Sequence, residues 1–346
     1  MGRNNKKYHK SLHQQAYERL TAMQAFGESK KDAVSNESEK EKIFSYNTYQ
    51  TYWKHTKYFL KWIQEKYPGC TTLRAAKRHV NEFLRSRVNQ VDAKGQHLSA
   101  WTIQTEAAAL NKLFRIDKAD PDRFQPPQRR REDIIRSRVS TVRDKHFSVT
   151  NNDELIRFCK GTGCRRNVLE RLEGHDLWTR DQMEKEVSSL YRRRDLSDKE
   201  IKHLATLKDA LAMFPNEDFF IHHRKDKNGR SRFAPIIGPD KQNIIERMKN
   251  TEPGEKVWLH VNSNADIHAY RADYATILYK MQARKIENIP YDKYHPGIGR
   301  KIQSDVYVCR KDEAGKKLDR NALRICSKAL GHNRVSVVAN NYLRGL

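Results

Sequence analysis

The chain has 346 residues, enough for two or three domains, and its hydrophobic residues (37%) are sufficient for compact cores. Its 68 Lys and Arg against 43 Asp and Glu give a formal net charge of +25. This excess favours a polyanionic partner such as nucleic acid over a small neutral substrate. No apolar run approaches the ~18 residues of a membrane span, and no apolar segment follows the basic N-terminus as it would in a signal peptide. We therefore expect a cytoplasmic protein with no membrane partner.

Residues 1–42 are polar and basic, and we predict that they form an N-terminal tail or arm with at most a short amphipathic helix. Residues 43–118 carry three apolar stripes at helical spacing. The first stripe is expected to begin after Ser45, the second after Thr71 or Thr72 as the helix cap, and the third after Ser99 as the cap. This pattern predicts a compact helical domain.

Residues 119–149 combine prolines with dense arginines, which is typical of a charged interdomain linker. In a protein that holds a duplex between two domains, such a linker would lie along the DNA backbone. The candidate DNA-binding residues of this segment are Arg129, Arg130, Arg131, Arg136, Arg138 and Arg143.

Residues 150–346 are predicted to form a second, α+β domain. A strongly charged stretch at about 179–212 predicts two helices joined near residues 195–197. Asn228-Gly229 between two apolar segments is a strong signal for a β-hairpin. Residues 267–284 read as a further helix, so the whole chain is predicted to be mainly α with a small β-hairpin or sheet.

The C-terminal segment contains Leu330-Gly331-His332, followed about three helical turns later by Tyr342-Leu343. Gly331 is suited to end or bend a helix, and an apolar segment then leads to Tyr342. This pattern resembles the C-terminal signature of the tyrosine recombinases, the phage-integrase family. The helical segment 43–118 likewise resembles that family's SAM-like core-binding domain, which precedes the catalytic domain.

Two earlier motifs extend the resemblance. Thr162-Gly163-Cys164-Arg165 stands where the family has its first catalytic arginine, with Arg166 as the alternative; Val168 occupies the place of the usual acidic residue. The family's catalytic lysine lies on a β-hairpin that ends in a basic residue, a short apolar stretch and a proline. Counted back from Pro235, Lys227 takes this position and Lys225 is the fallback. The charged helical segment at about 179–212, between these two motifs, looks like an insertion in the catalytic domain.

The family's second arginine belongs to a His-x-x-Arg motif a little over twenty residues before Leu-Gly-His. Tyr307-Val308-Cys309-Arg310 lies at that distance, with tyrosine in place of histidine. His295 followed by Arg300 is the competing pair, although its internal spacing differs. The resemblance therefore implies a catalytic set of Arg165, Lys227, Tyr307, Arg310, His332 and Tyr342.

This set implies a site-specific recombinase or integrase of a mobile element, which cuts and rejoins DNA through a 3′-phosphotyrosyl bond at Tyr342. Arginine forks suit phosphate oxygens, Lys227 would protonate the leaving oxygen, and a phenol such as Tyr307 is a poor base near neutral pH. Since the arginines supply positive charge, no metal and no cofactor are expected, and neither is ATP. The implied partners are double-stranded DNA, a homo-tetramer on that DNA and accessory DNA-bending proteins.

Two other functions compete with the recombinase. A type IB topoisomerase-like enzyme shares the attacking tyrosine and the arginines, but would relax DNA as a monomer without a defined site. A DNA-binding protein that has kept the fold and weakened its catalysis would explain Val168 and Tyr307.

Overall fold

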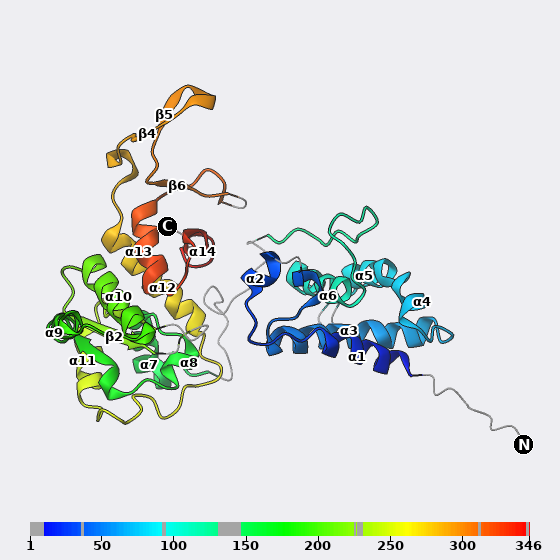
Figure 1. Ribbon diagram of the computed structural model, residues 1–346, viewed down its shortest axis with the longest axis horizontal. Coiled ribbons are helices and arrows are strands. Elements are labelled where there is room, and N and C mark those ends of the chain that lie inside the picture. Colours follow the sequence, from blue (N-terminus) through cyan, green and yellow to red (C-terminus); the bar gives the residue numbers. More distant parts are fainter. Residues whose placement is uncertain are drawn as a thin grey trace, which may run out of the picture. The chain divides into compact units, whose positions relative to one another are not determined.

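The computed structural model describes residues 10–35, 38–91, 95–130, 147–224, 226, 231–310, 313–343 and 346. The chain is mainly helical with small antiparallel sheets, and it divides into two compact units, Met1–Ile134 and Ile135–Leu346 (Figure 1). The division falls within residues 119–149, the segment predicted to be a linker. No helix in the described residues is long and apolar enough to cross a membrane.

In the described residues of the first unit, the regular elements are helices, with two isolated β-bridges. Ser45, Thr72 and Ser99 cap three of its helices, each accepting a bond from a backbone N–H three residues later. The cap at Ser99 was predicted, and Thr72 is one of the two caps that the sequence left open for the second predicted helix of this unit. Its α-helices are α1 (Leu12–Ala22), α2 (Lys30–Ser35), α3 (Tyr46–Lys66), α4 (Leu73–Lys77), α5 (Val80–Asn89) and α6 (Ala100–Leu113).

The N-terminal segment contributes to the core of the first unit from α1 onward. Leu12, Ala16 and Leu20 are buried along one face of α1, in the same cluster as Phe59 of α3. The predicted short amphipathic helix is confirmed as α1, but it is not part of a tail, because its apolar face is buried in this core. Residues 1–9 lie outside the described residues.

A buried carboxylate links three helices of this unit. Glu106 of α6 accepts two hydrogen bonds from the Arg87 guanidinium of α5, at 2.9 and 2.7 Å, and lies 3.2 Å from His55 Nδ1 of α3. Burial alone would raise the pKa of Glu106, but the bonds from His55 and Arg87 outweigh it and lower that pKa. The folded state therefore favours the charged carboxylate.

Glu106→Gln should lower the free energy of unfolding by about 3 kcal/mol at neutral pH, because it leaves Arg87 without its charged partner. Since the folded pKa of Glu106 is depressed, its charge stabilises the fold above the unfolded pKa of about 4.3, and this contribution is lost as the pH falls further. Urea unfolding at several pH values should show the difference from wild type shrinking below about pH 4. Glu65→Gln, at an exposed pair with Lys61, is the control; an equal effect of both changes would contradict the assignment.

The second unit combines packed helices with small antiparallel sheets in its described residues. Its strands are β1 (Leu177–Thr179), β2 (Phe219–His223), β3 (Arg232–Pro235), β4 (Lys293–His295), β5 (Arg300–Ile302), β6 (Val306–Val308) and β7 (Lys317–Asp319). Its α-helices are α7 (Asp153–Thr162), α8 (Arg166–Leu169), α9 (Arg180–Arg192), α10 (Asp198–Met213), α11 (Lys241–Lys249), α12 (Ile267–Gln282), α13 (Arg320–Ala329) and α14 (Val335–Asn341).

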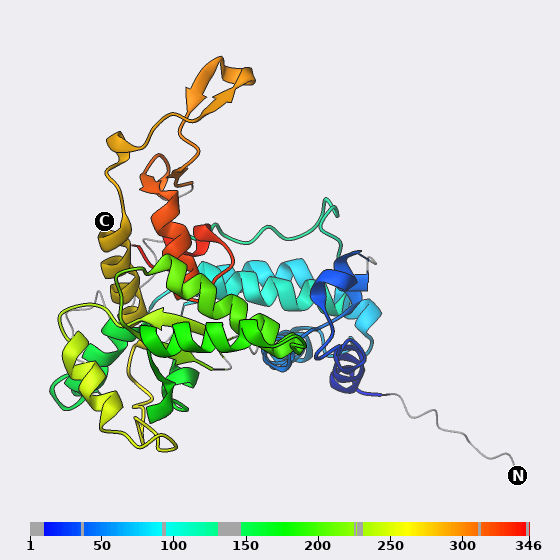
Figure 2. The same cartoon turned by 60° about the vertical axis from the view of Figure 1, so that its left-hand side comes forward.

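The main sheet has the order β1-β2-β3, and all its strand pairs are antiparallel. The pairing of β2 with β3 confirms the predicted hairpin, and α12 confirms the predicted helix near residues 267–284. Strands β4 and β5 form a separate two-stranded hairpin, which projects from the rest of the second unit in both views (Figure 2).

The charged stretch at 179–212 forms the two helices that were predicted, α9 and α10. Ser197 starts α10 with a capping box in which Glu200 reciprocates, and this explains the break between the helices. Met183, Leu190 and Leu207 are buried in the core of the second unit, so the inner faces of both helices pack against it. Only their outer faces are solvated.

Candidate functional site

The end of α13 fixes the backbone around His332. Gly331 adopts the left-handed conformation (φ 69°), and the His332 N–H donates to the Ser327 carbonyl at 2.7 Å. The Ser327 hydroxyl donates back to the His332 carbonyl at 3.0 Å. Both bonds hold the turn between α13 and α14, as expected for a glycine that follows a helix end.

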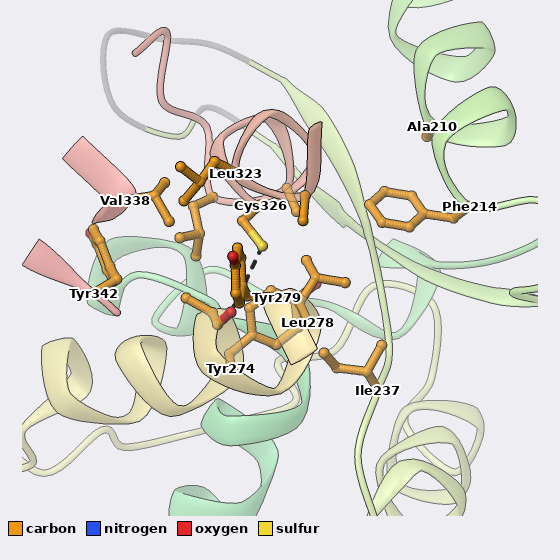
Figure 3. Packing of buried hydrophobic residues seen from close by; sticks show 14 of the residues in the cluster. Ala210, Phe214, Ile237, Tyr274, Leu278, Tyr279, Leu323, Cys326, Val338 and Tyr342 are labelled. Atoms are coloured by element: carbon orange, nitrogen blue, oxygen red, sulfur yellow. Dashed lines mark hydrogen bonds between the residues drawn. The ribbon is translucent and has the colours of Figure 1, made fainter. Parts of the chain in front are cut away.

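Helix α14 returns the chain so that Tyr342 meets His332. Tyr342 lies at the end of α14, with Val338 of the same helix beside it in the core (Figure 3). Its hydroxyl oxygen is 3.1 Å from His332 Nε2, and the side chain as a whole is buried. The two residues singled out by the C-terminal motif therefore form a phenol–imidazole pair. With Nε2 unprotonated, the phenol donates to the imidazole.

Two arginines converge on one backbone carbonyl beside this pair. Arg165 follows the left-handed Gly163 at the end of α7, and its guanidinium donates to the Leu330 carbonyl at 3.1 Å. Arg271 of α12 donates to the same carbonyl at 3.1 Å and also to the Gly163 carbonyl. The Arg271 guanidinium lies 5.8 Å from the ring centroid of Tyr342.

A third arginine and one carboxylate complete the cluster. Asp226 is buried on the β2–β3 hairpin, where it accepts a hydrogen bond from Arg165 and lies 3.1 Å from Arg232 of β3. None of the three Arg232 guanidinium nitrogens, all buried, makes a hydrogen bond with a described residue. Asp226 thus contacts two of the three guanidinium groups, and one carboxylate for three arginines leaves an excess of positive charge.

Burial changes the acidity of this cluster. Burial lowers the pKa of Arg232 to about 10, although the Asp226 carboxylate acts in the opposite direction. Burial likewise lowers the pKa of Arg271 and, with the positive charges of Arg232 and Arg271, holds the pKa of His223 well below its usual value. Each shift measures the cost of keeping positive charge away from water, and a bound anion would reduce that cost.

A small cavity with a volume of about 180 Å³ opens onto one side of this cluster, where neither Tyr342 nor Arg271 is part of its lining. Its lining includes Arg165, Asp226, Arg232, Gly331 and His332. Arg165 is 13% exposed, so it is the guanidinium of the cluster best placed to meet an entering group. The arrangement combines a nucleophilic phenol, an imidazole acceptor and desolvated positive charge, which suits attack on a phosphate ester.

The structure separates the candidate pairs left open by the sequence. Arg166 donates to four backbone carbonyls between residues 261 and 265, which is a structural role and favours Arg165 as the site residue. Lys227 and Lys225 lie outside the described residues. His295 and Arg300 face each other across β4 and β5 on the projecting hairpin.

Tyr307 and Arg310 lie in another part of the second unit. Tyr307 is on β6, Arg310 is exposed, and both line a groove that reaches the start of α14. Within the described residues, Arg310 makes no hydrogen bond to Arg165, His332 or Tyr342. The structure therefore places Arg271 beside the phenol, whereas Arg310 lines a different pocket from Arg165 and His332.

The candidate DNA-binding arginines of the predicted linker are only partly described. Arg129 and Arg130 are exposed, and the Arg129 guanidinium lies 5.6 Å from the Trp101 ring centroid in the first unit. Arg131, Arg136, Arg138 and Arg143 lie outside the described residues.

Arg271, Arg232 and Asp226 were not identified as site residues from the sequence. Arg271 and Arg232 nevertheless lie in recognisable sequence motifs. His268-Ala269-Tyr270-Arg271 has the His-x-x-Arg spacing that was sought, but it precedes Leu330-Gly331-His332 by far more than the expected interval. The segment containing β4–β7 accounts for the difference. Arg232 is the basic residue before the apolar stretch that ends at Pro235.

No known protein-family model and no curated protein sequence matches the chain.

Gly331→Ala should destabilise the protein more than the same substitution at a left-handed glycine that has no close neighbours. Alanine would have two costs here. Its Cβ would lie only 2.8 Å from Arg232 Nε, and the left-handed backbone conformation would cost about 1–2 kcal/mol. Gly299→Ala is the matched control, because Gly299 has a similar φ of 61° and no neighbour within 4 Å. We expect urea unfolding to show an extra loss of about 1–3 kcal/mol for Gly331→Ala. Equal losses would contradict the close packing of Arg232 against this turn.

Proposed function

We propose that this protein is a DNA strand-transfer enzyme of the tyrosine-recombinase type, which cuts and rejoins DNA through a 3′-phosphotyrosyl bond at Tyr342. The observation that carries the proposal is the pair formed by the Tyr342 hydroxyl and His332 Nε2 at 3.1 Å, next to a buried cluster of three arginines with one carboxylate. A phosphodiester is the anionic ester that this combination suits.

In the proposed reaction, the Tyr342 hydroxyl oxygen forms a bond to phosphorus while the bond from phosphorus to the 5′ oxygen breaks. His332 Nε2 accepts the phenol proton, because it is already within hydrogen-bond distance. Lys227, the next residue after Asp226 in the sequence, is proposed to protonate the departing 5′ oxygen. The step needs neither a metal ion nor ATP, since all atoms and protons are accounted for.

The arginines would stabilise the charge that develops on the non-bridging oxygens. Arg165 is proposed to bind the phosphate directly, and the buried Arg271 to supply positive charge behind the phenol. Asp226 holds Arg165 from the hairpin, and thereby supplies the carboxylate that Val168 does not provide. The proposal includes a homo-tetramer on two duplexes, accessory DNA-bending proteins and a role in moving a mobile element.

The covalent intermediate tests this proposal. Nicked duplexes that carry candidate attachment sites from the flanks of the gene should give a slow-migrating protein–DNA adduct in the presence of EDTA. Tyr342→Phe should abolish the adduct, because the nucleophile is lost, whereas Tyr46→Phe, at an exposed tyrosine of the first unit, should not. Absence of the adduct on a duplex that the protein binds would refute the enzyme and leave a DNA-binding protein. Relaxation of supercoiled DNA without site preference would indicate the topoisomerase instead.

Arg271 and Arg310 can be distinguished by matched lysine substitutions. Arg271→Lys should slow adduct formation at saturating DNA by about 10²-fold or more, because one donor group beside the reaction is lost. Arg310→Lys should alter that rate much less, since Arg310 is exposed on the groove. Urea unfolding of both variants controls for misfolding of the buried Arg271 site. If Arg310→Lys slowed adduct formation more than Arg271→Lys did, Arg310 would be the catalytic arginine.

A further inference from the structure

A large basic groove lies beside the candidate site in the second unit, with a volume of about 1020 Å³. Strand β5 and the following turn, strand β6 and the start of α14 contribute to its lining, which includes Ile302, Tyr307 and Val335. Tyr342 directly follows α14, so the groove is lined in part by the helix that precedes the proposed nucleophile.

Positive charge dominates this groove. None of its described lining residues is Asp or Glu, and none of its cations forms a salt bridge with a described carboxylate. The basic residues of the lining are Lys293, Arg300, Lys301, Arg310, Lys317, Arg320 and Arg334. Such a concentration of one sign of charge attracts polyanions and repels other cations.

The neighbouring carboxylates hydrogen-bond to groups other than the cations of the groove. Asp292 accepts bonds from the backbone N–H and the hydroxyl of Ser304. Asp305 and Asp319 both accept hydrogen bonds from Arg284, which lies outside the groove lining. Arg320 donates to the Val306 carbonyl at 3.2 Å, but its buried Nε has no hydrogen-bond partner among the described residues.

The shape of this region also fits a duplex. Strands β4 and β5 form an exposed two-stranded hairpin that projects from the second unit, in register from Lys293 opposite Ile302 to His295 opposite Arg300 (Figures 1 and 2). A two-stranded ribbon has the width that the major groove of DNA admits. Cations along its side would contact the phosphates that border that groove.

We propose that the groove formed by β5, β6 and the start of α14 is a second DNA-backbone site, which binds the duplex beyond the cleaved phosphate. This inference rests on the proposed function, since it takes DNA as the substrate of Tyr342. Arg310 and Tyr307 then belong to the surface that holds the duplex. The β4–β5 hairpin extends this surface away from the reacting phosphate.

The test is the salt dependence of DNA binding. All proteins carry Tyr342→Phe, so that binding is measured without cleavage, and the probe is a duplex of arbitrary sequence. The groove variant combines Arg300→Ala and Lys301→Ala. The matched control combines Arg194→Ala and Lys199→Ala, one exposed Arg and one exposed Lys in and before α10, neither of which forms a salt bridge with a described residue. Both pairs are exposed, and circular dichroism melts verify that the variants fold.

We expect the groove variant to bind more weakly and to reduce the slope of log K against log salt concentration by about two units, because two phosphate contacts are lost. The control should keep the wild-type slope. An unchanged slope in the groove variant would overturn the second site, while adduct formation at Tyr342 would still support the enzyme. Failure of every protein to bind DNA would overturn the proposed function together with this inference.

Discussion

The carbonyl oxygen of Leu330 is the point on which the candidate site depends, because Arg165 and Arg271 both donate to it at 3.1 Å. These arginines come from the end of α7 and from α12, which are far apart in the sequence. Their shared acceptor ties both to the last turn of α13. The next two residues, Gly331 and His332, then turn the chain toward α14, so the arginines and Tyr342 are placed by the same helix end.

The desolvation cost of the buried arginines favours the binding of an anion. Buried guanidinium groups are expensive to desolvate, and Asp226 compensates only part of the charge of Arg165, Arg232 and Arg271. The lowered pKa values of Arg232 and Arg271 express that cost. An entering phosphate would complete the compensation, and in a site shielded from water its interaction with the arginines is strong. The same excess of positive charge continues on the surface in the groove beside α14.

Much of this architecture could be predicted from local sequence patterns. Contacts between residues far apart in the sequence could not be predicted in this way. Helix caps and the Asn228-Gly229 turn signal act over a few residues, so the helices and the β2–β3 hairpin could be predicted. His332 and Tyr342 were identified for the same reason, since a single short helix separates them. Arg271 was missed because β4–β7 intervene between its motif and Leu330, and sequence distance across such a segment does not report spatial distance. Whether Asp226 or Val168 lies beside Arg165 likewise depends on tertiary packing.

The most direct test of the central claim is to identify the amino acid that becomes attached to DNA. The trapped adduct would be trimmed with nuclease and protease, and the remaining nucleotide–peptide would be sequenced by mass spectrometry. The account predicts a nucleotide joined through its 3′ phosphate to the Tyr342 hydroxyl oxygen. A nucleotide on any other side chain, such as Tyr307, would contradict it.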